Sequence, residues 1–490
     1  MIFEFGEFTP DLSQALPGKT TKVVNVIPTS DGYLPFPSFV SQNVQALPSR
    51  CLGGASIRDL SGISRSFLAT ATKIYEVTGL SLTDKTRVSG NYSVTGTNIW
   101  SFVIGKNQLI ATTIEEPVQV ITLGEANFTN LFTSTRKPKG NCVTVSYLDW
   151  LVLGDVTDSV DGDRPTRVWW SERGDFTNMD PNIDDRSGFR DLDQQYGKIV
   201  ALHTREFTSV FQEQAIHRMT FEGGSSTFRF DLVERHIGLI SPGAIAHFGP
   251  NSYYLSTNGF QVFNGNVSTP IGHDKVDRYV LSNIDYNNLS LISCSIYPKY
   301  KLVAWGIPFA GSTGINKIFL YNWASGKWSE VDVNLERILP TYTLGVGVDD
   351  ANFTDLYIDS LPQSEWLIDD VAFAGGLPVF SAIDQAHNYL VASGSPMKAT
   401  LETNYVNMTN RVIIDRLIPV IAKVVNPQLM VYIRNDFGDM NEVAFGPFNR
   451  NLFMEFVPIV EGRHFRFGIT MDNFERAIGL DVSFFDKGER

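Results

Sequence analysis

The sequence is poor in cysteine and has no excess of basic residues. Only three cysteines occur among 490 residues, Cys51, Cys142 and Cys294, and no pair has the CxxC spacing of zinc or redox sites. Neither a disulfide framework nor a zinc site is indicated, so we expect the three cysteines to be buried and to behave as small apolar side chains. The net charge is −13, which argues against stable nucleic-acid binding because such binding needs a basic surface.

Long apolar runs and helical periodicity are also scarce. No run approaches the ~18 apolar residues that cross a bilayer, so we expect no membrane span. The segment MIFEFGEFTPDL carries acidic residues where a secretory signal carries basic ones, which predicts synthesis in the cytoplasm. One short amphipathic stretch, residues 273–284, is the single helix candidate.

Catalytic motifs are missing as well. There is no GxSxG elbow, Walker loop or GxGxxG turn, and the Asp box of sialidases is not matched by WASGKWSEV. We therefore expect no enzyme, with no catalytic, cofactor-binding or metal-binding residues and no cofactor. The histidines form no HxH or HExxH pair; they are His203, His217, His236, His247, His273, His387 and His464.

Two acidic segments are candidates for other roles. The segment GDVTDSVDGDRP holds Asp155, Asp158, Asp161 and Asp163, and several carboxylates could bind Ca²⁺. Their spacing does not fit the EF-hand register, so a solvated inter-strand loop is favoured over the metal site. The segment 180–193 mixes aspartates with arginines, which favours a surface or interface charge network.

What the chain does contain is a β-rich repeat. Gly (40 residues) and Pro (23) are scattered throughout, as expected for many short strands joined by turns. From residue 55, β-rich runs begin at positions 67, 108, 150, 208, 253 and 302. This period fits the roughly 40–50 residues of a four-stranded propeller blade. We predict an all-β fold with a roughly six-bladed β-propeller over residues 51–395, whose last, least regular blade includes 356–370 and 376–394.

Turn dipeptides and tryptophans support this prediction. Asn258-Gly259 and Ser325-Gly326 are expected at hairpin turns. The tryptophans could stack on sugars, but β-rich repeats favour packing between blades. The residues concerned are Trp169, Trp170, Trp323 and Trp328.

The two ends of the chain differ from the repeat. Residues 1–50 contain six prolines and no sustained periodicity, so we predict an extended N-terminal arm without a core of its own. Residues 396–490 contain longer alternating segments, which predict a C-terminal β-sandwich assembly domain. A domain boundary near residue 396 follows.

Several segments, taken in order, resemble the tail nozzle or tail-hub structural proteins of short-tailed phages. FGEFTPDL and NVIPTSDGYLPFPSF resemble the opening of that family, and VWWSERGDFTNM resembles a blade motif, with Phe176 and Met179 where the family often has Trp. YYLSTNGFQVFNGNVSTPIGHDKVD resembles a second blade element. DSLPQSEWLIDD with FSAIDQAH, and the close AIGLDVSFFDKGER, complete the resemblance over nearly the whole chain.

The resemblance implies a virion structural protein of the phage tail. It implies a homo-hexameric ring below the portal and adaptor, with contacts to the adaptor and tail fibre proteins and a channel for genome ejection. Double-stranded DNA would pass without specific binding, since an acidic lumen repels phosphates. The arm, residues 1–45, would dock to the adaptor and be dispensable for folding. The alternatives are a propeller-type receptor- or glycan-binding tail protein and a glycan-degrading enzyme.

Overall fold

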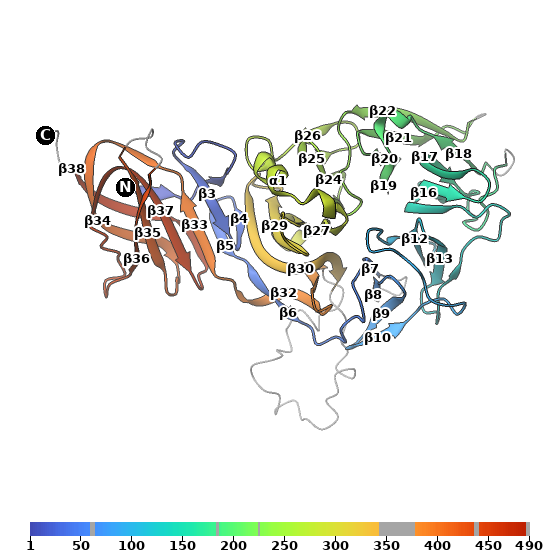
Figure 1. Cartoon of the computed structure of the whole chain (residues 1–490), viewed down its shortest axis with the longest axis horizontal. Coiled ribbons are helices and arrows are strands. Elements are labelled where there is room, and N and C mark those ends of the chain that lie inside the picture. Colours follow the sequence, from blue (N-terminus) through green and yellow to red (C-terminus); the bar gives the residue numbers. More distant parts are fainter. Residues whose placement is uncertain (59–63, 183–185, 224–225, 343–377, 436–440, 487–490) are drawn as a thin grey trace, which may run out of the picture.

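The fold consists of a ring of β-sheets beside one large curled sheet (Figure 1). The computed structural model describes residues 1–58, 64–182, 186–223, 226–342, 378–435 and 441–486. The all-β class and the propeller are confirmed. The segment 356–370, which was predicted to belong to the last blade, lies outside the described residues.

Five blades are separate antiparallel sheets of four consecutive strands. Blade 1 holds β7 (Gly53–Arg58), β8 (Ser64–Ala69), β9 (Ile74–Thr78) and β10 (Ser81–Asp84). Blade 2 holds β11 (Ser101–Gly105), β12 (Gln108–Thr113), β13 (Glu116–Thr122) and β14 (Thr129–Asn130). Blade 3 holds β15 (Lys139–Ser146), β16 (Trp150–Asp158), β17 (Gly162–Trp170) and β18 (Gly188–Asp191). Blade 4 holds β19 (Ile199–Thr204), β20 (Thr208–Gln212), β21 (Ala215–Phe221) and β22 (Phe228–Arg235). Blade 5 holds β23 (Ile245–Phe248), β24 (Asn251–Ser256), β25 (Gly259–Phe263) and β26 (Ser268–Pro270).

The ring is completed by a sixth blade and a closing blade. Blade 6 holds β27 (Ser293–Tyr297), β28 (Leu302–Ile307), β29 (Ile315–Asn322) and the first half of β30 (Trp328–Tyr342). The second half of β30 pairs with β31 (Pro378–Asp384), which is followed by β32 (Tyr389–Pro396) and β6 (Pro37–Ser41). Because β30 also lies beside β7 of blade 1, the ring closes, and its outer closing strand comes from the N-terminal segment (Figure 1).

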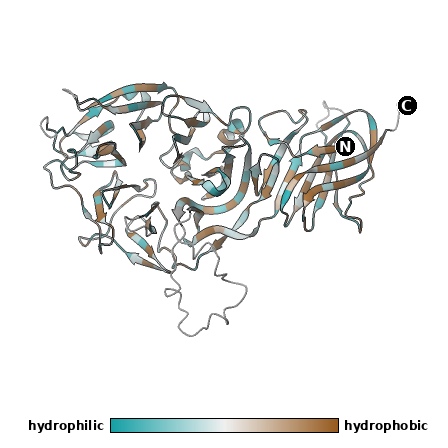
Figure 2. Ribbon diagram, turned by 180° about the vertical axis from the view of Figure 1, so that it is seen from behind, coloured by the Kyte–Doolittle hydropathy of each residue, from teal (hydrophilic) through white to brown (hydrophobic). Residues whose placement is uncertain are grey.

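Adjacent blades bury their apolar faces against each other. Trp169 of blade 3 packs with Ile110 and Val118 of blade 2, and Trp150 packs with Val210 of blade 4. Hydrophobic and hydrophilic residues alternate along many strands, as Figure 2 shows. The prediction that tryptophans fill the spaces between blades is confirmed for Trp169, Trp170 and Trp328, and all three cysteines are buried and free, as predicted.

The C-terminal strands form one continuous curled sheet whose two halves enclose a shared core. They are β33 (Ala399–Thr403), β34 (Val406–Ala422), β35 (Gln428–Arg434), β36 (Val443–Asn449), β37 (Val460–Met471) and β38 (Arg476–Asp486). Strand β34 pairs with β37 through its first half and with β38 through its second half, which curls the sheet. The change from the closing blade to this sheet falls between β32 and β33.

The N-terminal segment is extended, but it is not a separate arm, which corrects the sequence-based expectation. Its strands are β1 (Ile2–Glu4), β2 (Glu7–Phe8), β3 (Lys19–Val24), β4 (Val26–Thr29) and β5 (Gly32–Pro35). Strand β1 pairs with β38, and β3 pairs with β33. Phe5, Phe8 and Tyr33 are buried in a hydrophobic core that includes residues of the curled sheet and of blades 4 to 6. The sequence suggested an arm without a core because the strands of this segment are short. These strands complete a sheet that is made by residues some 400 positions later.

Helices are short. The candidate at 273–284 is confirmed as α1 (Asp277–Asn283). Short 3₁₀ segments occur at η1 (Gln194–Tyr196), η2 (Tyr286–Leu291), which is kinked at Asn288, and η3 (Pro298–Tyr300). Among the described residues, no helix is long and apolar enough to cross a bilayer. One predicted turn shifts by a residue: Ser256 pairs with Gly259, so Thr257 and Asn258 form the loop and Gly259, at φ +111°, begins β25.

Candidate assembly joint between the propeller and the curled sheet

The first contact of this joint is made by Asp11, in the segment FGEFTPDL. Its carboxylate oxygens accept hydrogen bonds from the backbone N–H groups of Arg278 (2.8 Å) and Tyr279 (2.7 Å) at the start of α1. The residue that precedes the helix, Val276, offers no side-chain acceptor. Asp11 therefore supplies the helix cap from a distant part of the chain. The backbone N–H of Asp11 also donates to the carbonyl of Lys275 at 3.1 Å.

An ion-pair network lies beside this cap. The Nζ of Lys275 is 2.6 Å from one carboxylate oxygen of Glu7, and the Nζ of Lys19 is 3.0 Å from the other. Burial alone would raise the pKa of Glu7, but hydrogen bonds from the two lysines outweigh burial and lower it. Lys275 also donates to the carbonyl of Gly326, in the turn between β29 and β30. One ammonium group thus links the N-terminal segment to blade 6.

Asp277 connects α1 to blade 5. Its Oδ1 accepts a hydrogen bond from the backbone N–H of Phe260 at 2.9 Å, and burial raises the pKa of Asp277 to about 6. A Cβ on Gly259 would lie 2.2 Å from this carboxylate, so only glycine fits there. The ring of Phe260 packs against Trp305 and Trp328 at centroid distances of 4.8 and 4.7 Å.

The NVIP segment binds blade 6 and the curled sheet at once. The backbone N–H of Asn25 donates to Glu330 of β30 at 2.8 Å, and its Nδ2 donates to the carbonyl of Lys398 just before β33, also at 2.8 Å. The Oγ of Ser329 donates to Val26 at 2.7 Å. Asn25 has a φ of +61°, a conformation that asparagine tolerates better than most residues. Three of the segments that resemble the phage tail family, FGEFTPDL, NVIP and PIGHDKVD, therefore meet at this joint, where their contacts are structural.

The aspartate-rich loop is part of an arginine network in blade 3. Arg136 binds both Asp158 and Asp161, and Arg167 lies 2.6 Å from Asp161. Hydrogen bonds from the two arginines lower the pKa of Asp161 to about 2. The guanidinium of Arg136 also lies 4.6 Å from the ring centroid of Trp169. The loop forms the turn between β16 and β17 with the adjoining strand ends. Its tip and Asp163 are exposed as expected, while Asp158 and Asp161 are bound by arginines.

Two further aspartates of these acidic segments differ in their surroundings: Asp155 bonds to Asn141, whereas Asp191 extends the arginine network. Burial raises the pKa of Asp155 to about 6, and its Oδ2 accepts from Asn141. Asp191 forms an ion pair with Arg167 at 2.6 Å, in line with the charge network expected for 180–193. Within the described ranges, no three His, Cys, Asp or Glu side chains are grouped closely enough to hold a metal ion.

Two histidines that are far apart in the sequence stack on each other. His203 on β19 and His247 on β23 have ring centroids 3.5 Å apart and planes 2° apart. Burial, with a smaller contribution from Arg205, lowers the pKa of His203 to about 4, and burial also holds the pKa of His247 well below its usual value. The Nδ1 of His247 lies 2.9 Å from the Oγ of Ser252. Sequence reasoning missed this pair because 44 positions separate the two residues and no local motif marks them.

Comparisons with known proteins give only structural matches of low identity and low TM-score. No protein-family model matches the sequence, and no curated protein matches it. BamB from Moraxella catarrhalis is 10% identical, with a TM-score of 0.35, covering 80% of this chain and 97% of BamB. The computationally designed Ika8 protein is 10% identical, with a TM-score of 0.37 and coverages of 72% and 99%. The WD40 repeats of RRP9 are 9% identical, with a TM-score of 0.39 and coverages of 64% and 89%.

Proposed function

We propose that this chain is a structural subunit of the tail of a short-tailed phage, of the nozzle or tail-hub kind. In this role six copies form a ring below the portal and adaptor, and the genome leaves through its channel. The observation that carries the proposal is the joint: three of the segments that resemble the family, FGEFTPDL, NVIP and PIGHDKVD, fix the propeller to the curled sheet. Their contacts are structural, which suits an assembly protein.

The curled sheet offers a surface for contact between subunits. The connection from β36 to β37 exposes a run of apolar side chains, of which Leu452 is 98% and Phe453 81% exposed. Strand β36 pairs only with β35 in the described sheet and also exposes Val443 and Phe445. Exposed apolar patches and unpaired strand edges are typical of surfaces that bind another chain. In the proposed ring, this surface contacts the next copy.

The ring can be tested with purified protein. Size-exclusion chromatography with light scattering and negative-stain imaging should show a hexamer with an axial channel. The double variant Leu452→Asp, Phe453→Asp should remain monomeric with an unchanged melting temperature. Val88→Asp is the matched control, because Val88 is equally exposed (88%) but lies on the propeller. A wild-type monomer at every concentration, or a trimer, would count against the nozzle.

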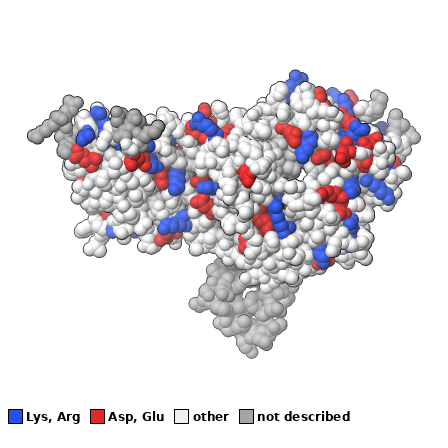
Figure 3. Space-filling view, in the orientation of Figure 1, with Lys and Arg blue, Asp and Glu red and all other residues white. Residues whose placement is uncertain are grey.

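The charge of the channel bears on passage of DNA. On the face drawn in Figure 3, acidic and basic side chains are interspersed, without a field of one sign. The net charge of −13 per copy supports a lumen that repels phosphates. Mapping the channel wall of the assembled tail by electron cryo-microscopy tests this point, and a lining dominated by Lys and Arg would contradict it.

A second candidate is a receptor- or glycan-binding tail protein. A polar pocket at the side of blade 4 favours it, and its lining is described in the next subsection. The two roles are compatible, because the pocket lies on the propeller and the proposed ring contact lies on the curled sheet.

A further inference from the structure

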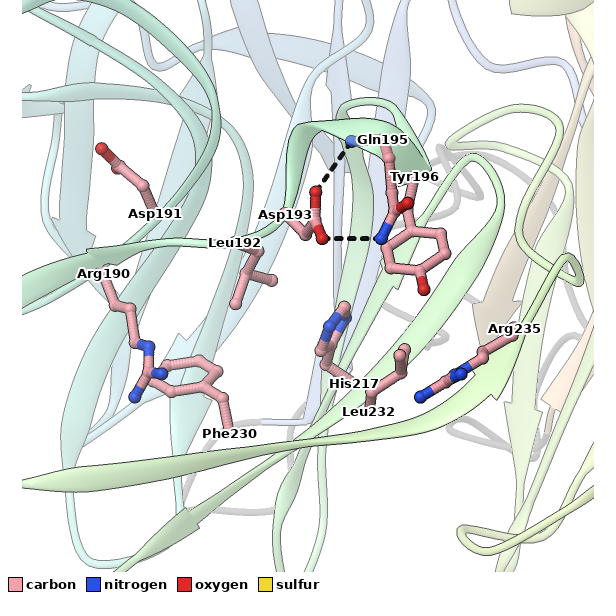
Figure 4. A pocket seen from close by; sticks show the side chains of 10 residues that line it. All are labelled: Arg190, Asp191, Leu192, Asp193, Gln195, Tyr196, His217, Phe230, Leu232 and Arg235. Atoms are coloured by element: carbon pink, nitrogen blue, oxygen red, sulfur yellow. Dashed lines mark hydrogen bonds between the residues drawn. The ribbon is translucent and has the colours of Figure 1, made fainter.

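A pocket opens where the outer strand of blade 3 meets blade 4 (Figure 4). Its volume is about 400 Å³, within the range of sites for small ligands. Arg190 comes from β18, Tyr196 from η1, His217 from β21 and Arg235 from the end of β22. Figure 4 shows Tyr196, His217 and Arg235 on one side of the pocket and Arg190 with Phe230 on the other.

The acidic residues of this lining already have partners. Both carboxylate oxygens of Asp191 accept from Arg167, at 2.6 and 3.0 Å. The carboxylate of Asp193 accepts from the backbone N–H and the side-chain amide of Gln195, at 3.0 and 2.6 Å (Figure 4). Neither carboxylate neutralises an arginine of the pocket.

The two arginines of the lining have no such partners. Within the described part of the chain, Arg190 and Arg235 form no ion pair, and Arg190 lies over the ring of Phe230 at 5.5 Å. Arginine carries five donors and no acceptor. The pocket therefore offers a surplus of charged hydrogen-bond donors to any ligand that brings acceptor oxygens.

His217 adds a buried group without a partner. Its side chain is 6% exposed, and its Nδ1 has no hydrogen-bond partner among the described residues. Its ring packs edge-on against Tyr196, with centroids 6.2 Å apart. A buried polar atom without a partner costs free energy, and rotation of the His217 ring towards the pocket would let a ligand hydroxyl satisfy it.

We propose that this pocket binds a carboxylate-bearing sugar, with Arg190 or Arg235 holding the carboxylate and Tyr196, Gln195 and His217 binding its hydroxyl groups. Paired donors on arginine match the two oxygens of a carboxylate. The alternating donors and acceptors of Tyr, Gln and His suit hydroxyl groups, which both donate and accept. The lining contains both arginines and the carboxylates of Asp191 and Asp193. These carboxylates would repel a small inorganic anion, so the pocket suits such an anion less well. This inference does not depend on the assembly of a ring.

Isothermal titration calorimetry of the full chain tests the proposal. The probes are a glucuronic acid-containing tetrasaccharide, a neutral tetrasaccharide, N-acetylneuraminic acid and inorganic phosphate, at physiological ionic strength. We expect at least one acidic sugar to bind and the neutral sugar and phosphate not to bind. Arg190→Gln and Arg235→Gln should together lower the affinity at least tenfold, with the melting temperature unchanged.

The matched control is Arg229→Gln. Arg229 lies on β22 like Arg235 but pairs with Asp231 at 3.0 Å and is not part of the pocket lining. Its substitution should leave the affinity unchanged. The proposal is overturned if neither acidic sugar binds, if phosphate competes as well as the sugar, or if the control variant weakens binding as much as the pocket variants do.

Discussion

The carboxylate of Asp11 accepts a hydrogen bond of 2.8 Å from the backbone N–H of Arg278, a residue 267 positions later in the chain. With the neighbouring bond to Tyr279, it caps a helix that lacks a cap of its own. The N-terminal segment is thereby fixed to the propeller through Asp11 and to the curled sheet through β1, β3 and Asn25. The two parts of the molecule are held together by a segment that belongs to both.

The cap can be tested by Asp11→Ala. Loss of the carboxylate leaves two N–H groups of α1 without acceptors, so we expect the free energy of unfolding to fall by about 1 kcal/mol. Urea denaturation followed by tryptophan fluorescence measures the change. Asp31→Ala is the control, because Asp31 pairs with Arg476 at the surface, and its loss should leave the midpoint unchanged. Equal effects of both variants would contradict the capping role.

Deletion of residues 1–45 should prevent folding of the curled sheet, contrary to the expectation from sequence. The deletion removes β1 to β6 and exposes the partners of Phe5, Phe8 and Tyr33. We expect an insoluble product or rapid proteolysis of residues 399–486. Point variants on β3 give a milder test: Val23→Asp places a charge in the core, whereas Lys22→Ser changes an exposed side chain on the same strand. A soluble, protease-resistant deletion protein would show that the segment is an arm after all.

Breaking the arginine network of blade 3 should be costly. Asp158 is 2% exposed, and Arg136→Ala leaves its carboxylate without the guanidinium. We expect a loss of about 3 kcal/mol, the magnitude typical of removing one partner of a buried ion pair. Arg229→Ala, at an exposed ion pair, is the control and should change stability little.

Added Ca²⁺ tests the alternative of a calcium site in the aspartate-rich loop. Because Arg136 and Arg167 occupy the oxygens of Asp158 and Asp161, added Ca²⁺ should not raise the melting temperature of the wild-type protein. A clear rise with Ca²⁺, absent with Mg²⁺, would revive the metal site.

Acid should loosen the contact between blades 4 and 5. The pKa of His203 is about 4 in the folded protein, below the usual value near 6.5, so below about pH 6.5 the unfolded chain binds the additional proton. Stability should therefore fall as the pH drops from about 6.5 towards 4, by at most about 1.4 kcal/mol per pH unit for each histidine. Hydrogen exchange of β19 and β23 at about pH 7 and about pH 5 measures the effect.

Two variants separate this effect from general acid sensitivity. His203→Gln removes one titrating ring and should flatten the pH dependence. His273→Gln, at an exposed position, should leave it as in the wild type. Identical pH profiles of the wild type and His203→Gln would contradict the role of the stacked pair.

The class of fold and the repeat could be predicted from the amino-acid sequence. Alternating β-rich runs at blade-sized intervals depend on local side-chain pattern, so the propeller, the buried tryptophans and the short helix at 277–283 could be predicted. The burial of the three cysteines could also be predicted, because their spacing fits no metal site and an unpaired cysteine behaves as a small apolar residue.

How distant segments of the chain combine became visible in the three-dimensional structure alone. The closing strand β6, the cap from Asp11, the stacked pair of His203 and His247 and the donor-rich pocket each join residues that no local pattern connects. The N-terminal segment shows the reason most clearly. Its short strands and prolines lack an apolar period of their own, because the surface that buries Phe8 and Tyr33 is built by residues at the other end of the chain.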